Sequence, residues 1–316
     1  MESDGTVAFE QALLSLRRDG HTHHRQMSLA LPPYLQALML AYSEELYADA
    51  ERYSVLIDEL LKLPTHILFV SLNYDTLLDS NLDAFARLQS IDDYVSGDRN
   101  WSLIKPHGSA NWFIELDQPF DPTAPAETFV VPNRSIKSVP TQSHALYVAR
   151  GLISPSDEHG MTQRYPAIAL PEGPKDELVL PRAHLEHLRS ALKSAWALDV
   201  MVLGYSALDT EVLELLGQSG ARIRRMTVVN RDPESTLAVY TTIERYGIEA
   251  IWPDTFDGSY EDWIDGDGLR RWVEEFGGLK GVAYPSLTSP GDLEKRIATH
   301  KLEERRRRDA DAATGS

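Results

Sequence analysis

The chain has 316 residues, of which 42% are hydrophobic, so it can build a sizeable core and is not globally disordered. Its 31 basic and 48 acidic side chains give a formal net charge of −17, which argues against nucleic acid as the default partner. The absence of cysteine excludes disulfides, thiolate zinc sites and cysteine nucleophiles.

The N-terminal part of the chain predicts helices. Residues 1–30 are polar and irregular in pattern, whereas hydrophobic residues recur at steps of three and four between residues 33 and 63. Pro64 ends this run. We assign residues 1–55 to a helical N-terminal segment. The N-terminus lacks a signal-peptide pattern and no apolar run is long enough to cross a membrane, so we expect a soluble, cytoplasmic protein.

Short candidate strands follow. Residues 66–70 form an apolar run rich in strand-forming side chains, and residues 103–105 are a shorter candidate. Residues 117–165 carry scattered proline, serine and aspartate, which predicts a long excursion with weak structure. Residues 167–170 predict another strand.

Strands and helices then alternate with short turns. A helical stripe covers residues 185–196, and strands are expected at 200–203, 226–229 and 248–251. This alternation is typical of a parallel sheet with helices on both faces. We therefore predict a Rossmann-like α/β fold with a helical N-terminal segment. We assign the α/β core to residues 56–258, a helical extension to 259–300 and a disordered tail to 301–316.

The helices of this region carry end signals. Ser206 opens a capping-box-like helix start, with Gly217 as the stop of that helix. Asp232 and Pro233 supply an N-cap and a first-turn proline for the next helix, which Gly247 closes.

Polar residues follow the first predicted strand, and ligands of parallel sheets bind at the carboxyl ends of the strands. Ser71 begins this segment, and the Asn-x-Asp spacing of Asn73 and Asp75 places an amide and a carboxylate on the same side of a turn. An amide can orient a water or a ribose hydroxyl, and a carboxylate accepts hydrogen bonds from hydroxyls. Alternatively, Asp75 caps a helix that starts at Thr76.

Residues 105–112 read Lys-Pro-His-Gly-Ser-Ala-Asn-Trp and follow the second candidate strand. Histidine is a common general base, so His107 can accept a proton from a sugar hydroxyl or an attacking water. Gly108 allows the backbone to approach a ligand closely. The alternative is a histidine that makes a structural hydrogen bond.

Residues 204–209 read Gly-Tyr-Ser-Ala-Leu-Asp and follow the strand at 200–203. A helix starting at Ser206 would offer free N–H groups to an anion, and the serine could donate to a phosphate or a ribose. A simple capping box satisfies the same spacing. Asn230 follows the next strand, where it could contact an adenosine ribose or belong to an ordinary helix cap.

In this order, the segments resemble those of the SIR2-like family, which reads N-x-D, then K-x-H-G-S-x-N-W, then G-Y-S-x-x-D. The resemblance runs from about residue 56 to about residue 256. It implies hydrolysis of NAD to nicotinamide and ADP-ribose. Asn73 would align the attacking water or the ribose, His107 would act as the general base or hold the ribose hydroxyls, and Asp75 would stabilise the cation-like sugar.

The resemblance also implies binding residues and a biological setting. Relatives of this bacterial type commonly deplete NAD in antiphage defence, often beside a sensor domain. NAD would be the substrate and no metal is expected. A sensor protein or a second copy of the chain are the partners to consider, and neither membrane nor nucleic acid is expected. The nucleotide would be held by Ser71, Gly108, Gly204, Tyr205, Ser206, Asp209 and Asn230.

Two departures from the family pattern qualify this hypothesis. The glycine-rich G-A-G-x-S loop that wraps the pyrophosphate in relatives is not found, and Gly266-Asp-Gly268 lies between aspartates and predicts a turn. Each missing hydrogen bond to a charged phosphate costs ~1.5–3 kcal/mol. A catalytically impaired module that binds a nucleotide or a partner is therefore the alternative.

Other chemistries are less well supported by the sequence. Sirtuin deacylases resemble this core but carry a four-cysteine zinc module, which a chain without cysteine cannot form. His184 and His187 lie three residues apart with no evident companion ligand, so we expect them on a helix surface rather than at a metal.

Overall fold

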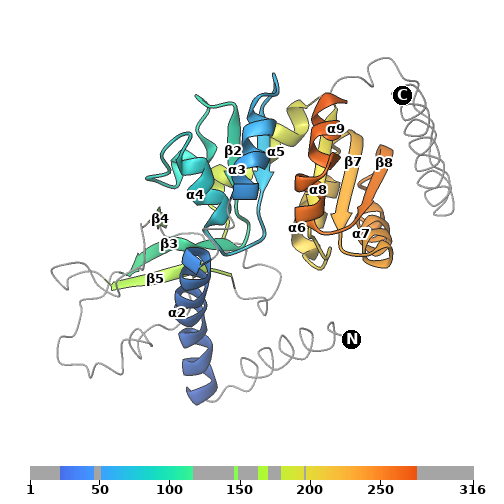
Figure 1. Ribbon diagram of the computed structural model, residues 1–316. Helices are drawn as coiled ribbons and strands as arrows, with labels where there is room; N and C mark the ends of the chain where they lie inside the picture. Colours follow the sequence, from blue (N-terminus) through green and yellow to red (C-terminus); the bar gives the residue numbers. More distant parts are fainter. Residues whose placement is uncertain are drawn as a thin grey trace, which may run out of the picture. The chain divides into compact units, whose positions relative to one another are not determined.

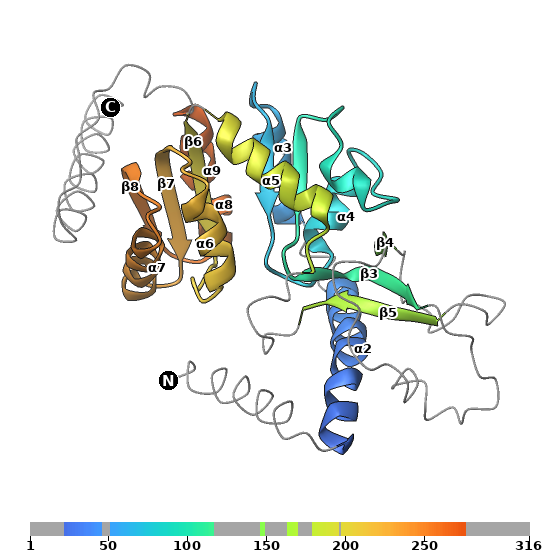
Figure 2. The ribbon, with the colours of Figure 1, turned by 180° about the vertical axis from the view of Figure 1, so that it is seen from behind.

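The computed structural model describes residues 22–45, 51–116, 146–148, 163–169, 179–195 and 197–275. The chain divides into two compact units, unit 1 (Met1–Leu188) and unit 2 (Arg189–Ser316). Each unit contains a parallel sheet with flanking helices, and unit 1 begins with a helix (Figures 1 and 2). This confirms the predicted Rossmann-like α/β fold with a helical N-terminal segment. None of the described helices combines the length and apolarity needed to cross a membrane.

Unit 1 contains two sheets, one parallel and one antiparallel. Its elements in chain order are α2 (Thr22–Glu45), α3 (Glu51–Leu61), β1 (Ile67–Val70), α4 (Leu77–Asp83), the 3₁₀ helix η2 (Asp92–Val95), β2 (Trp101–Ile104), β3 (Gly108–Leu116), β4 (Leu146–Val148), β5 (Gln163–Ile168) and the first part of α5 (Arg182–Ser194).

Unit 2 contains a single described sheet of three parallel strands in the order β6-β7-β8. After the end of α5, its elements in chain order are β6 (Leu198–Leu203), α6 (Thr210–Gln218), β7 (Ile223–Asn230), α7 (Pro233–Arg245), β8 (Ala250–Asp257), α8 (Tyr260–Asp265) and α9 (Gly268–Glu274).

Helix α2 begins earlier than the sequence pattern predicted. We expected residues 22–30 to be irregular because their pattern is polar, yet they are helical, and Pro32 and Pro33 both lie inside α2. The helix packs against the antiparallel sheet, where the Gln36 amide donates to the carbonyl of Ala110 over 2.9 Å. Both views show α2 beside β3 and β5 (Figures 1 and 2). Contact with this sheet therefore stabilises a helix that contains two prolines.

The strands of the parallel pair in unit 1 were predicted, whereas β3 was not. Strands β1 and β2 pair in parallel, with Ile67 opposite Trp101. Strand β3 continues the His-Gly segment and lies between β4 and β5. Its buried Ala110, Trp112 and Ile114 alternate along the strand, which is a signal that could have identified it.

Helices cover both faces of the unit 2 sheet. On one face, Met226 and Val228 of β7 join a core with Leu213 of α6 and Tyr240 of α7. On the other face, the guanidinium of Arg225 lies 4.4 Å from the ring centroid of Trp272 in α9 and donates to that residue's carbonyl. Because neighbouring residues of a strand point to opposite faces, α7 and α9 cover opposite faces.

The predicted end signals of the unit 2 helices are confirmed for α7 but not for α6. Asp232 caps α7, since its carboxylate accepts from the Ser235 N–H over 2.8 Å, and Gly247 follows the helix with a φ of 75°. Gly217 was predicted as a helix stop but lies inside α6. A Cβ there would overlap with the carbonyl of Tyr246, so this glycine permits close packing instead.

A tyrosine of α7 also links two strands. The Tyr240 hydroxyl accepts from the N–H of Asp254 on β8 and donates to the carbonyl of Met226 on β7. These main-chain groups lie where Met226 pairs with Pro253, and proline has no N–H to donate. The buried hydroxyl thus completes the hydrogen bonding between the strands, and burial raises the pKa of Tyr240 well above its ordinary value.

Candidate functional site

The carboxyl ends of β1 and β2 meet at one edge of unit 1. The two strands are parallel neighbours, so the segments that follow them leave the sheet on the same side. The Ser71 N–H donates to the carbonyl of Ile104 over 2.9 Å, and the Ala110 N–H donates to the carbonyl of Tyr74 over 2.8 Å. The predicted Asn73–Asp75 segment and the predicted His107–Gly108 segment therefore lie side by side.

Two of the three catalytic candidates at this edge differ in exposure. Asn73 is exposed, and His107 is half-buried with its ring centroid 6.3 Å from that of Tyr74. Both segments are tied to Ala169, which follows β5. The Tyr74 hydroxyl donates to the Ala169 carbonyl over 2.6 Å, and the Ala169 N–H donates to the His107 carbonyl over 2.9 Å. Backbone geometry thus keeps the imidazole near the Asn-Tyr-Asp turn.

Asp75 has a local structural role, although it is not the N-cap that the sequence offered as an alternative. Its Oδ1 accepts from the N–H of Leu77, the first residue of α4, over 3.0 Å. The preceding N-cap position is Thr76, whose own N–H donates to the Ser43 hydroxyl on α2 over 3.1 Å. One carboxylate oxygen of Asp75 therefore holds the start of a helix, and this side chain is half-buried.

Gly108 has a structural reason to be glycine. Its φ is 79°, and a Cβ at this position would overlap with the carbonyl oxygen of Ala167 in β5. We expected the main chain at Gly108 to approach a ligand closely, but it approaches the neighbouring strand β5 instead. Gly108 lies where the chain turns from the His107 loop into β3.

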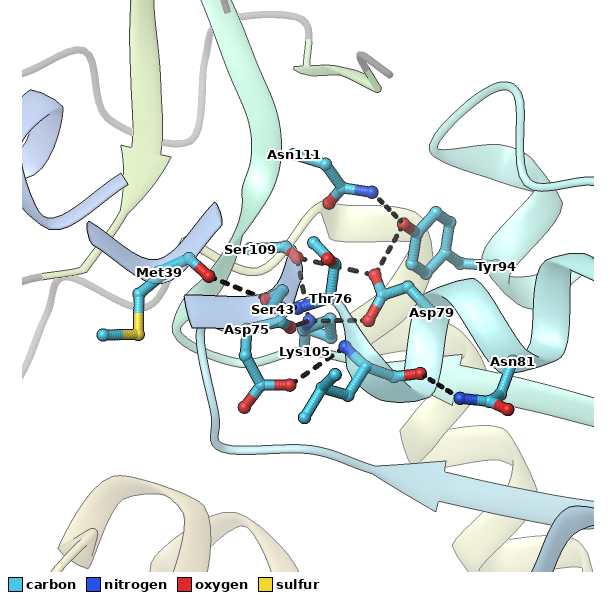
Figure 3. Close-up of polar contacts among 11 residues, drawn as sticks. Met39, Ser43, Asp75, Thr76, Asp79, Asn81, Tyr94, Lys105, Ser109 and Asn111 are labelled. Atoms are coloured by element: carbon cyan, nitrogen blue, oxygen red, sulfur yellow. Dashed lines mark hydrogen bonds and ion pairs between the residues drawn. The ribbon is translucent and has the colours of Figure 1, made fainter. Parts of the chain in front are cut away.

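Beneath this edge lies a buried ion pair that the sequence analysis did not predict (Figure 3). The ammonium of Lys105 is 2.7 Å from Oδ2 of Asp79, and the exposed fractions of the two side chains are 0% and 3%. The same ammonium donates to the carbonyl of Asp75 over 2.6 Å and to the Ser109 hydroxyl over 2.8 Å. All three of its protons therefore have acceptors.

The carboxylate of this pair has further partners. Tyr94 donates its hydroxyl to Oδ1 of Asp79 over 2.8 Å and accepts from the Asn111 amide over 3.2 Å (Figure 3). Burial, and then the charge of Asp79, raise the pKa of Tyr94 well above its ordinary value, so the phenol stays protonated and donates. Residues from α4, η2, β3 and the loop after β2 are thus joined in one network.

His184 lies next to this network, which corrects its expected place on a helix surface. The side chain is fully buried, its ring centroid lies 5.5 Å from that of Trp112, and its Nε2 is 2.8 Å from the carbonyl of Ile91. Burial lowers the pKa of His184 to about 4. The imidazole is therefore neutral near pH 7, and Nε2 carries the proton that is donated to the carbonyl.

His187 is also not a simple surface residue. Its Nε2 and the Nε2 of His66 both contact the buried Ser102 hydroxyl, over 3.0 and 2.9 Å. Burial, and then His66, lower the pKa of His187. Among the residues that the structure describes, no group of three or more His, Asp or Glu side chains is placed to hold a metal ion.

The remaining predicted residues lie in unit 2, at the carboxyl ends of the parallel strands β6 and β7. Gly204 has a φ of 60°, and its N–H donates to the carbonyl of Val229 over 3.0 Å. The amide of Asn230 donates to the carbonyl of Tyr205 over 3.1 Å. The structure thus brings Gly204, Tyr205 and Asn230 together at one edge of this sheet.

Ser206 does not open a helix, which corrects the predicted capping box. Helix α6 begins at Thr210 with Asp209 at its N-cap position, and no side chain caps it there. Between them, Ala207 takes a left-handed φ of 58° and buries its side chain in the unit 2 core. Packing of Ala207 therefore turns the chain away from a helical start, and Ser206 is left exposed.

The sequence could have suggested part of this site. A lysine inside the Lys-x-His-Gly segment was visible, but its partner Asp79 lies 26 residues earlier in a helix with many other polar residues.

Neither the protein-family models, nor the curated proteins, nor the solved structures that were compared with this chain gave a match.

Proposed function

We propose that this chain is a SIR2-like, cytoplasmic protein that hydrolyses NAD to nicotinamide and ADP-ribose. The observation that carries the proposal is the pairing of β1 with β2, which sets the Asn73 turn beside the His107 loop at one edge of a parallel sheet. An exposed amide and a half-buried imidazole at such an edge are suited to align and deprotonate a water molecule.

In the proposed reaction, water attacks the anomeric carbon of the nicotinamide ribose as the bond to nicotinamide breaks. The bonding electron pair moves to the pyridinium nitrogen, which neutralises it, and the attacking water loses a proton to His107. Asn73 orients that water. The carboxylate of Asp75 lies at the base of the same turn and stabilises the positive charge that develops on the sugar.

The unit 2 edge supports the nucleotide-binding part of the proposal. Gly204 has open space around the position of a Cβ, so its main chain is accessible to a ligand. Tyr205 and Asn230 lie beside it, with Ser206 exposed next in the chain and Asp209 ahead of α6. The sequence resemblance assigns phosphate and ribose contacts to these residues. The same sequence resemblance supports a role in antiphage defence through NAD depletion.

Turnover of NAD tests the proposal directly. Purified protein incubated with NAD is expected to release nicotinamide and ADP-ribose in equal amounts, measured by chromatography. Asn73→Ala and His107→Ala are each expected to lower kcat by about 10²-fold or more, as for loss of an acid–base or water-orienting group. The matched control is His66→Ala, a histidine that precedes β1 at the opposite end of the strand, and it should retain kcat. Full activity in both site variants would refute the assigned roles.

A catalytically impaired module that binds nucleotides is the second candidate, favoured by two observations. Gly108 faces the carbonyl of Ala167 rather than open space, and Ser206 does not begin a helix, so two expected ligand contacts are weakened. This candidate predicts no NAD turnover even at high protein concentration, together with a rise in melting temperature when ADP-ribose is added. Absence of both turnover and stabilisation would contradict both candidates.

A further inference from the structure

We propose that Lys105 is a positioning residue, whose buried ammonium holds the main chain after Asn73 at a fixed place relative to the His107 loop. The effect of Lys105 on catalysis rests on the proposed function. Its effect on the position of the main chain can be measured without NAD.

The geometry that carries the inference is the set of three hydrogen bonds made by one ammonium. Each acceptor belongs to a different segment: the Asp75 carbonyl to the turn after β1, the Asp79 carboxylate to α4, and the Ser109 hydroxyl to β3. Lys105 itself lies between β2 and His107. A single buried cation therefore joins both loops of the proposed active site (Figure 3).

Lys105 and the carbonyl that it binds are each close in sequence to a catalytic candidate. Lys105 precedes His107 by two residues, and the carbonyl that it binds follows Asn73 by two residues. A shift of the ammonium would thus be transmitted to both catalytic candidates through short stretches of main chain. Lys105 is fully buried and does not itself reach a ligand, so it acts through these segments.

Stability alone does not require a charged pair here. Moving two charges out of water is costly, and a buried ion pair can often be replaced by apolar residues of similar volume without loss of stability. What apolar side chains could not supply is the directed bond to the Asp75 carbonyl. That bond fixes the position of the turn that carries Asn73. An amide that orients a water molecule must itself be held in a fixed position.

The test compares two changes to the same network. Lys105→Met combined with Asp79→Asn removes both charges together and keeps an oxygen to accept from Tyr94. Tyr94→Phe is the matched control, because it removes a buried hydrogen bond to Asp79 but leaves all three bonds of the ammonium in place.

Hydrogen–deuterium exchange of residues 71–77 provides the first measurement. The N–H groups of Ser71, Thr76 and Leu77 all have acceptors in the native protein, so they should exchange slowly. We expect the double variant to exchange at least tenfold faster in this segment, and Tyr94→Phe to stay within twofold of the native rate. An unchanged rate in the double variant, or an equal increase in both variants, would overturn the inference.

Steady-state kinetics with NAD provides the second measurement. The double variant should lower kcat at least tenfold while KM changes less than threefold, and Tyr94→Phe should keep kcat within threefold. Because a smaller folded fraction would also lower the apparent kcat at constant KM, kcat is expressed per folded protein, measured by circular dichroism. If the native protein does not turn over NAD, the proposed function fails, and the exchange rates still decide the positioning role.

If the double variant does not fold, a milder variant tests the same inference. Ser109→Ala removes one acceptor of the ammonium and leaves both charges. It is expected to speed exchange in residues 71–77 about threefold, with no effect on residues 51–61 of α3. Unchanged exchange in residues 71–77 would contradict the inference.

Discussion

The two sheet edges that carry the predicted site residues are built differently. At the unit 1 edge, side chains from several elements converge on a buried ion pair, and the loops above it are held by hydrogen bonds to neighbouring strands. At the unit 2 edge, Gly204 and Ser206 are exposed, and no side chain caps the start of α6. The first edge is suited to hold reacting groups in place, and the second to receive a flexible ligand through main-chain contacts.

Removing one member of the buried pair should give the largest effect. Lys105→Met leaves the Asp79 carboxylate buried without its cation, which costs about 3–5 kcal/mol in the free energy of unfolding. Ser206→Ala at the exposed edge should change it by less than about 0.5 kcal/mol. Urea denaturation followed by tryptophan fluorescence measures both. A loss below about 1 kcal/mol for Lys105→Met would mean that the pair is not closed off from water.

Acid should weaken unit 1 through His184. Its folded pKa of about 4 lies below the value near 6.5 expected when unfolded, so the unfolded chain binds a proton first as the pH falls. The resulting stability is fully present above about pH 6.5 and is lost by about 3 kcal/mol on going to pH 4. His184→Gln should remove that part of the acid dependence. Unfolding curves at pH 7 and pH 4 that respond equally in both proteins would refute the assignment.

A glycine at each edge allows a comparison with a smaller expected change in the free energy of unfolding. Both Gly108 and Gly204 have positive φ, which costs a residue with a Cβ about 1–2 kcal/mol. At Gly108 the Cβ would also meet the Ala167 carbonyl, whereas at Gly204 it meets nothing. Gly108→Ala should therefore destabilise the protein by roughly 2 kcal/mol more than Gly204→Ala, as for other overpacked sites. Equal losses of unfolding free energy would show that β5 moves away readily.

The parts of the fold that the sequence predicted are those governed by local rules. The apolar run of β1 and the Asp232-Pro233 start of α7 each carry their signal within a few neighbouring residues. The α/β class and the adjacency of the Asn73 and His107 loops followed from these local elements, because the carboxyl ends of parallel neighbours share one edge.

The parts that sequence reasoning missed depend on distant contacts. Lys105 and Asp79 gain their importance from a pairing that neither local pattern encodes, and His184 was assigned to the surface because a helical stripe does not show what covers its flanks. At Ser206, a local capping pattern was overridden when Ala207 entered the unit 2 core. Tertiary packing, rather than propensity, decided each of these positions.

The hydroxyl of Tyr240 has a consequence for how unit 2 opens. Since one oxygen bridges main-chain groups of β7 and β8 from the covering helix α7, that helix cannot detach without breaking this bridge between the strands. Helix α7 and the β7–β8 pair should therefore melt as one cooperative block, in which the slowest-exchanging amides of all three segments share a single opening free energy.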